Sequence, residues 1–509
     1  MSNSKIFLGV FVVYCVGLMI AGWYASSREK MSGTGYFRGG NSNLFVFLFG
    51  TLSSIYSSWM FIGNPALLGR NGLAAGGWLI QVPLIGMCIH LLWNKEYMLV
   101  KKYNFKTTGE LMGNFFESKF IRTIVAIIAC LYCIPYICAQ MKGAGAIVST
   151  LSQGELSSDW GIYIIAGVTL VYMLLGGMKG TAITSAIQGF LLVCGFYGLA
   201  IFILKESSWS AMWSNLASMG PEYITTPGVH GGYGWSYTLT YALVCSFGII
   251  CAPTYTMWIA TCGKGFFQRS RRTAWIAWTL VCGFTYMVTM FVVGCGGLVL
   301  APNIENMDNL VPTVMLEYFP LAIFCLVGVA AIASAQSTAS TSLQAATSAV
   351  TEDLIEGVIG KQMTEKEKLW WGRGVTLVFL IISMLMSNQF SSMIAILGSV
   401  GVSFGFMLMP AWVTCMFSPV FSKEGVASGI VAGSAVLTYL YVTSSPLNSV
   451  IHFGFAGLIV NVVVASAVSA FTKKPSVDKV WQFHGYLRKR LSPEDAVEVC
   501  GRSTAEIAE

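Results

Sequence analysis

The sequence predicts an all-α polytopic membrane protein, and its composition and long apolar runs are the observations that predict this class. Of the 509 residues, 55% are hydrophobic and only 10% are charged, whereas soluble domains carry about a quarter charged residues. The mean hydropathy is +0.67. Apolar runs of about 20 residues, the length of a membrane-spanning helix, recur to about residue 472. This composition excludes a soluble enzyme and a soluble nucleic-acid-binding protein.

We expect about thirteen transmembrane helices. The first, 5–25, lacks the basic leader and the small-residue cleavage site of a signal peptide, so we interpret it as retained. The others are expected at 43–68, 74–94, 119–150, 159–177, 181–205, 235–262, 272–300, 312–352, 369–388, 392–418, 424–444 and 448–472. Residues 1–472 then form one transmembrane domain, followed by a cytoplasmic tail at 473–509.

The basic residues predict the orientation of these spans. With the N-terminus outside and strict alternation, Lys5, Arg70 and Lys205 lie outside and Lys142 lies within a span. The remaining Lys and Arg residues then lie inside. Because cytoplasmic loops are enriched in Lys and Arg, the sequence predicts an N-out and C-in arrangement.

Two spans contain residues that interrupt helices. The span 43–68 carries serines at 53, 54, 57 and 58, and the span 235–262 carries Gly248 and Pro253 near its middle. Irregular backbone at membrane depth is tolerated where it lines a cavity. Paired interrupted helices in corresponding halves indicate a transport site. Small polar residues are also common where membrane helices pack together, so one such span alone would be weak evidence. The prediction rests on the occurrence of two interrupted spans in corresponding positions of the two halves.

The span 312–352 contains hydroxyl groups on adjoining helix faces. Ser337 and Thr338 supply two of them, and the Ser334 carbonyl lies one turn earlier on the same face. Hydroxyl and carbonyl oxygens are suitable ligands for sodium. A face of small residues that only packs against a neighbouring helix is the alternative interpretation.

Three segments resemble the signatures of the solute:sodium symporter family, which includes the bacterial proline and pantothenate permeases. They are YCVG at 14–17 with YFRGG at 36–40, GGMK at 176–179 with TSAIQ at 184–188, and the segment from Ala330 to TEDL at 351–354. The likeness covers about residues 5–472.

This resemblance implies the inverted-repeat fold typified by LeuT, with repeat one at 43–205 mirrored by repeat two at 235–418. The helix 5–25 precedes the repeats, and 424–472 follows them. The implied sodium ligands are the carbonyls of Ser53, Tyr56 and Ser334 and the hydroxyls of Ser337 and Thr338. The implied substrate-binding residues are Ser57, Trp59, Cys245, Phe247 and Tyr255.

Two positions depart from the family pattern. Ser185 stands where several members have an Asp that helps to bind a second sodium ion, and Ile55 stands where proline permeases have an Asp. A second sodium ion and proline as the substrate are therefore not expected. The span map also places no Asp or Glu deep in a core helix.

Lys142 is the one cation that the map places inside a span. A lysine near the centre of a membrane helix costs about 2.5–3.5 kcal/mol on insertion scales. Three roles for its side chain are consistent with the sequence: reaching the outer interface, replacing a missing second cation, or pairing with an anionic substrate. A similar AQLKG stretch in monocarboxylate carriers of the family favours a substrate-binding role for Lys142 in AQMKG at 139–143.

Together these observations predict a secondary active transporter that carries a small organic solute, a monocarboxylate or an amino acid, with sodium by alternating access. A proton-coupled or uncoupled transporter of the same fold is the alternative. We expect sodium as the coupling ion and no cofactor. The 14 cysteines follow no metal spacing and no disulfide framework. We expect no catalytic residues, no nucleic acid and no obligatory protein partner. The expected location is the bilayer of a bacterial inner membrane.

Overall fold

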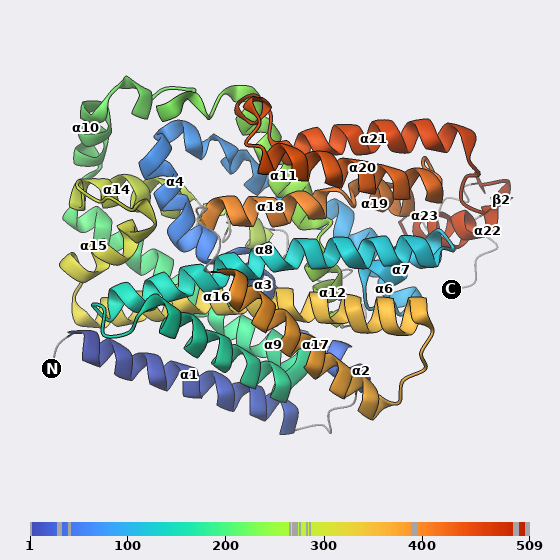
Figure 1. The fold of residues 1–509 in the computed structure, drawn as a ribbon, viewed down its shortest axis with the longest axis horizontal. Helices are drawn as coiled ribbons and strands as arrows, with labels where there is room; N and C mark the ends of the chain where they lie inside the picture. The colour runs from blue at the N-terminus through green and yellow to red at the C-terminus, as the bar shows by residue number, and fades with distance from the viewer. Residues whose placement is uncertain are drawn as a thin grey trace.

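The computed structural model describes residues 3–27, 33–38, 42–263, 266, 273, 276–280, 283, 284, 287–387, 394–491 and 498–503. Long helices run side by side along the longest axis of the molecule (Figure 1). They are α1 (Asn3–Ser27), α8 (Lys119–Leu151), α9 (Ser158–Glu206), α16 (Leu321–Ser348) with its π-helical continuation η8 (Ala349–Ile359), α17 (Glu365–Ser387), α20 (Lys423–Val442) and α21 (Phe453–Phe471).

Three further helices are bent by more than 40° at a short break. They are α3 (Leu44–Ile55) with η1 (Trp59–Gly63) and α4 (Asn64–Asn71), α11 (Trp235–Ile250) with α12 (Pro253–Thr261), and α18 (Ile394–Phe406) with α19 (Met409–Met416). The described residues thus contain 7 helices that are long and apolar enough to cross a membrane, or up to 10 if each bent pair is one span.

Shorter elements complete the chain. At the N-terminal side of the sequence they are α2 (Gly33–Arg38), η2 (Leu73–Ile80), α5 (Gln81–Cys88), η3 (Ile89–Trp93), α6 (Asn94–Tyr103), α7 (Thr108–Phe115), α10 (Trp209–Met219), η4 (Pro221–Tyr223) and η5 (Val229–Gly231). Later come η6 (Val288–Val293), α14 (Gly294–Leu300), η7 (Met307–Asn309), α15 (Leu310–Tyr318), η9 (Pro446–Ser449), α22 (Val477–Val480), η10 (Trp481–Gly485), α23 (Tyr486–Leu491) and the antiparallel strands β1 (Glu498–Val499) and β2 (Arg502–Ser503).

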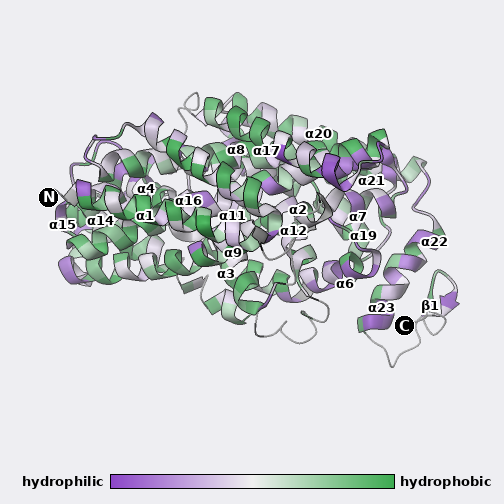
Figure 2. Cartoon of the chain, turned by 90° about the horizontal axis from the view of Figure 1, so that it is seen from below, coloured by the Kyte–Doolittle hydropathy of each residue, from purple (hydrophilic) through white to green (hydrophobic). Residues whose placement is uncertain are grey.

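The outer surface of the helices is apolar. Large hydrophobic side chains of α1 such as Val13 and Ile20 are exposed, and green hydrophobic ribbon covers most of the helices in Figure 2. A soluble protein buries such side chains, so this surface is suited to contact with lipid. Hydrophilic ribbon gathers at the end that holds α22, α23 and β1, which we call the tail end.

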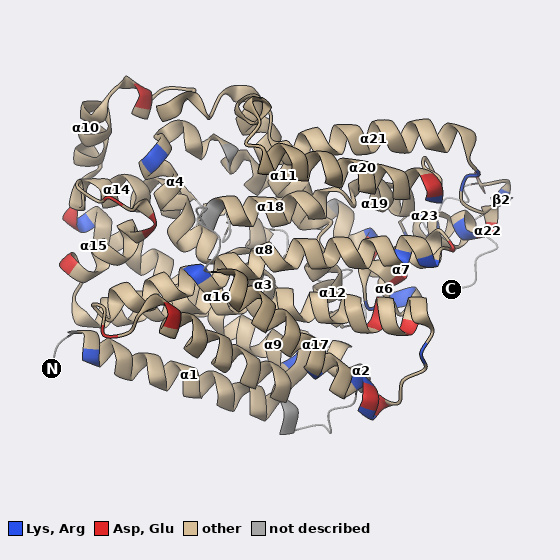
Figure 3. Cartoon of the chain, viewed as in Figure 1, with Lys and Arg blue, Asp and Glu red and all other residues tan. Residues whose placement is uncertain are grey.

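The charged residues of the described part also concentrate at the tail end, where α6, α7 and α23 lie (Figure 3). The start of α1 and the strand β2 lie towards opposite ends of the long axis (Figure 1). Because membrane proteins keep their ionised groups outside the hydrocarbon core, this distribution fits a long axis that crosses the bilayer.

The structure corrects several predicted boundaries. The expected span 312–352 is two helices, because Pro320 follows an extended Phe319 and begins α16 as its N-cap. Helical structure then continues through η8 to Ile359, seven residues beyond the predicted end. The expected span 392–418 has a break before Pro410 that the sequence analysis did not predict. Of the expected span 272–300, only the part from Val288 is described in full.

The expected spans 159–177 and 181–205 meet at a sharp reversal within α9. Gly177 has φ 51° and ψ −149°, a conformation that favours glycine. A Cβ atom at Gly180 would lie 3.6 Å from the Tyr172 carbonyl oxygen, whereas eight residues of straight helix span about 12 Å. The chain therefore turns back on itself at the GGMK segment.

Candidate functional site

Both predicted helix breaks are present, and the first lies at the centre of the candidate site. Helix α3 ends at Ile55, and the chain bends by 55° before η1 begins at Trp59. The Ser57 amide, which would donate to the Ser53 carbonyl in a continuous helix, donates to the Ile55 carbonyl instead. The break therefore removes the helical partner of the Ser53 carbonyl.

Helix α16 supplies hydroxyl groups to this carbonyl. Ser337 Oγ and Thr338 Oγ1 each lie 2.9 Å from the Ser53 carbonyl oxygen and 3.1 Å from the Ser334 carbonyl oxygen. The side chains of all four residues are fully buried. The structure thus brings together four of the five predicted sodium ligands as a cluster of uncharged oxygens. Such a cluster can coordinate a small cation once the hydroxyl protons turn away.

Tyr56, the fifth predicted sodium ligand, lies in the break itself. Its backbone has φ −80° and ψ 87°, outside the helical region. Its side chain is buried and packs edge-on against Phe196 at 6.1 Å between ring centroids. The Met60 amide donates to the Ser57 carbonyl, so the regular helical pattern resumes only after Tyr56.

Ser185, at the position of the family's second-site acid, also contacts the broken helix. Ser53 Oγ donates to the Ser185 carbonyl at 2.9 Å. The Ser185 hydroxyl is buried and has no hydrogen-bond partner among the described residues. The carbonyl of Ser185, not an acidic side chain, therefore faces this part of the site.

Gln140 on α8 is a site residue that the sequence analysis quoted but did not single out. Its Oε1 accepts hydrogen bonds from the Ser58 amide at 2.9 Å and from Ser58 Oγ at 2.8 Å. Its Nε2 donates to the Tyr136 carbonyl. A glutamine in an apolar run was the available signal in the sequence. In the structure Gln140 is fully buried, and its amide group caps the second half of the broken helix.

The predicted substrate-binding residues pack against several different neighbours. Trp59 lies against α18, where a Cβ atom on Gly398 would come within 3.1 Å of its ring. Phe247 stacks on Phe406 at 6.4 Å, and Tyr255 stacks on Trp93 at 5.2 Å.

Two others share a neighbour, because Ser57 and the buried Cys245 both lie close to the Tyr136 side chain. Lys142 is a half-buried residue of α8. Tyr136, which was not predicted as a site residue, links α8 to the first two broken helices.

A second link joins the two broken helices to α16. Ser54 Oγ lies 3.0 Å from Thr341 Oγ1 and accepts a hydrogen bond from Trp258 Nε1 at 3.1 Å. These residues come from α3, α16 and α12. At the central site the first two broken helices therefore meet α16, and neutral polar groups connect the three.

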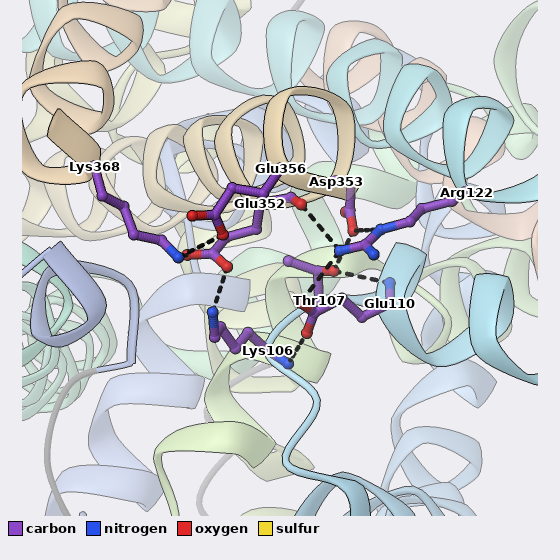
Figure 4. Close-up of polar contacts among 8 residues, drawn as sticks. All are labelled: Lys106, Thr107, Glu110, Arg122, Glu352, Asp353, Glu356 and Lys368. Carbon is purple, nitrogen blue, oxygen red and sulfur yellow. Dashed lines mark hydrogen bonds and ion pairs between the residues drawn. The ribbon is translucent and has the colours of Figure 1, made fainter. Parts of the chain in front are cut away.

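Charged groups form a separate cluster at the tail end (Figure 4). Glu352 on η8 is buried and pairs with Lys106 and with Lys368 on α17. Asp353 accepts from Arg122 Nε of α8 at 2.8 Å and from Thr107 Oγ1 at 2.7 Å. We call this set the tail-end ion cluster; its remaining members are Glu110 and Glu356.

The tail-end ion cluster gives a physical role to the TEDL segment, which the sequence analysis used only as a signature. The two acids fix η8 to α8, α17 and the segment that leads into α7. They are buried near the tail end of the span that the structure extends to Ile359, Glu352 at the predicted end of the span and Asp353 just beyond it.

Comparison with known proteins supports the family resemblance. The model of the sodium:solute symporter family matches residues 36–436. The sodium/proline symporter 2 of Staphylococcus saprophyticus is 23% identical over 93% of this chain and 95% of its own length. The sodium/pantothenate symporter of Haemophilus influenzae is 23% identical over 68% of this chain and 70% of its own.

Solved structures show the same fold. A sodium-coupled sialic acid symporter in a substrate-bound outward-open state aligns with a TM-score of 0.76 and 17% identity, over 92% of this chain and 99% of its own. MhsT in complex with L-phenylalanine aligns with a TM-score of 0.52 and 14% identity, over 85% of this chain and all of its own. This chain therefore belongs to the sodium:solute symporter family and is a multi-pass transporter of the cell membrane with the LeuT fold.

Proposed function

We propose that this protein is a sodium-coupled symporter that moves one sodium ion with each molecule of a small organic solute, a monocarboxylate or an amino acid. The observation that carries the proposal is the pair of hydroxyls on α16 that reach the Ser53 carbonyl at the helix break. The proposed ligands are the carbonyls of Ser53, Tyr56 and Ser334 and the hydroxyls of Ser337 and Thr338.

Coupling follows from where these ligands lie in the chain. Three belong to α16 and two to the first broken helix, so a bound sodium ion ties the two elements together. In alternating access, one group of helices moves against the other around a site at mid-membrane depth. An ion that bridges the two elements therefore favours the arrangement in which they are close, which is also the arrangement that completes the substrate site beside the break.

The proposed topology is about thirteen spans with the N-terminus outside and the tail in the cytoplasm. The asymmetry of Lys and Arg in the sequence supports this orientation. The tail end of the molecule then faces the cytoplasm.

A single sodium ion is proposed because Ser185 replaces the acid of the second site. A proton-coupled or uncoupled transporter of the same fold is the second candidate, and the same replacement favours it, together with Ile55 in place of an Asp.

The thermal stability of the purified protein in sodium or potassium chloride of equal ionic strength tests the coupling ion. We expect sodium alone to raise the unfolding temperature, because a ligand stabilises the state that it binds. Replacing Ser337 and Thr338 together with Ala removes two oxygens and should raise the half-saturating sodium concentration at least about tenfold.

Ser334→Ala is the matched control, because the Ser334 hydroxyl donates to the Ala331 carbonyl and only its backbone carbonyl is a proposed ligand. Equal stabilisation by potassium, or an equal loss in the control, contradicts the proposal.

Lys142 provides the test of substrate class. We propose that its ammonium group binds the carboxylate of the solute. A panel of monocarboxylates and amino acids in sodium buffer should contain compounds that stabilise the wild-type protein further. Lys142→Gln should abolish that second stabilisation and leave the effect of sodium alone unchanged. An unchanged response to the carboxylate removes Lys142 from the substrate site.

A further inference from the structure

Glu96 is a buried acidic residue outside both the central site and the tail-end ion cluster. It lies in the first turn of α6, where helical structure continues past the expected end at residue 94. Its side chain is 1% exposed. Thr256 of α12 donates a hydrogen bond to its Oε1, and Trp412 of α19 lies beside the same carboxyl group. The second halves of two broken helices, α12 and α19, therefore meet at Glu96.

The surroundings of Glu96 disfavour a negative charge. Among the described residues, Glu96 Oε2 has no hydrogen-bond partner and no ion pair reaches the carboxyl group. An ionised carboxylate that is buried without a counter-charge costs several kcal/mol, so such a group takes up a proton instead. In this arrangement of the helices, burial therefore favours the protonated, neutral form of the Glu96 carboxyl group.

The titratable groups around Glu96 come from every packed element and supply no compensating charge. Cys251 at the break before α12 and Cys415 on α19 are buried thiols near the carboxyl group. On α6 itself, Lys95 lies over the Phe417 ring at 3.4 Å and Lys101 donates to the Ala260 carbonyl. His484 of the tail bonds the Thr414 and Cys415 carbonyls.

Further charged groups lie on α6 and on the elements that flank it. Lys102 of α6 lies over the Tyr486 ring at 5.2 Å, and α23 carries Lys489 and Arg490 in addition to Arg488. From α7, Glu110 accepts from Arg122 and from the Lys106 amide. From α23, Arg488 lies near Lys95.

Two hydroxyl groups connect Glu96 to the part of the tail end that the tail-end ion cluster holds together. Thr108 Oγ1 of α7 donates to Thr256 Oγ1 at 2.8 Å, and Thr256 in turn donates to Glu96. The adjoining Thr107 and Glu110 are held by the tail-end ion cluster to α8 and η8 (Figure 4). Movement of α12 away from α7 must therefore break the Thr108–Thr256 contact and open the surroundings of Glu96.

We propose that Glu96 is a proton-binding residue whose proton keeps the tail end of the transport path closed. When α12 moves away and water enters, Glu96 releases the proton and its carboxylate is stabilised by water. Because the closed arrangement binds the proton more tightly, a higher pH on the tail side favours opening. This inference rests on the alternating access proposed above and adds a pH dependence that sodium coupling alone does not require.

The buried thiols beside Glu96 report this opening directly. The purified protein is treated with N-ethylmaleimide at pH values from 6 to 9, and modification of Cys415 is measured by peptide mass spectrometry. Cys295 on α14, near the opposite end of the molecule, is the internal reference. A higher pH raises the reactivity of every thiol, so the rate for Cys415 is divided by the rate for Cys295.

In the wild-type protein, we expect this ratio to rise at least about threefold between pH 6 and pH 9. Glu96→Gln mimics the protonated residue and should keep the ratio at its low-pH value throughout. Glu96→Asp retains a titratable acid and should retain a pH-dependent ratio. The matched control, Glu424→Gln, removes an exposed acid of α20 and should behave as the wild type.

A flat ratio in the wild-type protein overturns the proposal, and so does the same rise in Glu96→Gln as in the wild type. If Glu96→Gln does not yield folded protein, the pH dependence of the ratio in the wild type and in Glu96→Asp still tests the proposal. The measurement needs neither sodium nor an identified solute. A failure of sodium to stabilise the protein would therefore contradict the proposed symport without affecting this result.

Discussion

The central site and the tail-end ion cluster lie on the same continuous helix, α16 with η8, but they are built from opposite chemistry. At the centre, Ser337 and Thr338 reach the Ser53 carbonyl through neutral hydroxyl groups. Near the other end of the helix, Glu352 and Asp353 are ionisable and paired with Lys and Arg. About fifteen residues, or roughly 20 Å of helix, separate the two regions.

The difference indicates which contacts can change during transport. Neutral hydrogen bonds contribute about 1 kcal/mol each, and a hydroxyl can turn to accept or donate, so a cation can replace them at small cost. Removing one partner of a buried ion pair costs about 3–5 kcal/mol. We infer that the central contacts exchange during the transport cycle, while the tail-end ion cluster keeps η8, α8 and the start of α7 together.

Replacing Glu352 with Gln should have the largest effect on stability. Lys106 loses its carboxylate partner, and Lys368 keeps only Glu356. We expect the free energy of unfolding to fall by about 3 kcal/mol. Denaturant unfolding of the purified protein in detergent measures the change.

Glu424→Gln controls for the loss of an acid, because Glu424 is exposed and lies 3.8 Å from Lys423. An exposed pair contributes about 0–1 kcal/mol. Similar effects of the two substitutions would show that the tail-end ion cluster is no stronger than a surface pair, and the contrast between the two regions would fail.

Replacing Gln140 with Leu should have an intermediate effect on the central site. The Ser58 amide and hydroxyl then lose their acceptor while they stay buried. A buried donor without a partner costs about 1–3 kcal/mol. Gln140→Glu keeps an acceptor oxygen and should cost less than Gln140→Leu. Thermal unfolding of the two variants side by side measures this order, and equal losses would mean that packing, not capping, is the role of Gln140.

The helix break and the polar helix face at the central site could be predicted from the sequence because their signals are local. Four serines within six residues predicted the first break, and the spacing of Ser334, Ser337 and Thr338 predicted one polar face of a helix. These features depend on backbone geometry over one or two turns. The stacking partners of Tyr255 and Phe247, two of the proposed substrate-binding residues, come from other helices, and local spacing carries no signal for such contacts.

The tail end was poorly predicted because its contacts join residues far apart in the sequence. Arg122 and Asp353 are 231 residues apart, and Thr256 and Glu96 are 160 apart. In the sequence, Glu96 lies in the polar stretch NKEY next to a lysine and has the pattern of a solvated loop. Only the continuation of helical structure through α6, with α12 and α19 packed against it, buries the carboxyl group.

The smallest expected effect concerns the docking of the tail at His484. Its Nε2 lies 3.0 Å from the Thr414 carbonyl and 3.1 Å from the Cys415 carbonyl of α19, and its ring stacks on Phe115 at 5.6 Å. Burial lowers the pKa of His484 below its ordinary value near 6.5. The docked tail therefore prefers the neutral imidazole.

Acidification should weaken this docking. Because the pKa is lower in the docked state, the docking free energy is fully present above the ordinary pKa and is lost as the pH falls through it towards the lowered value. The loss is at most about 1.4 kcal/mol per pH unit. We expect amide hydrogen exchange in the segment 477–491, corrected for intrinsic rates, to be faster at pH 5.5 than at pH 7.5. His484→Gln keeps a side-chain N–H donor but does not titrate, so its corrected exchange should be the same at both values. A pH dependence that persists in His484→Gln would assign the effect to another group, such as Glu96, and not to the tail.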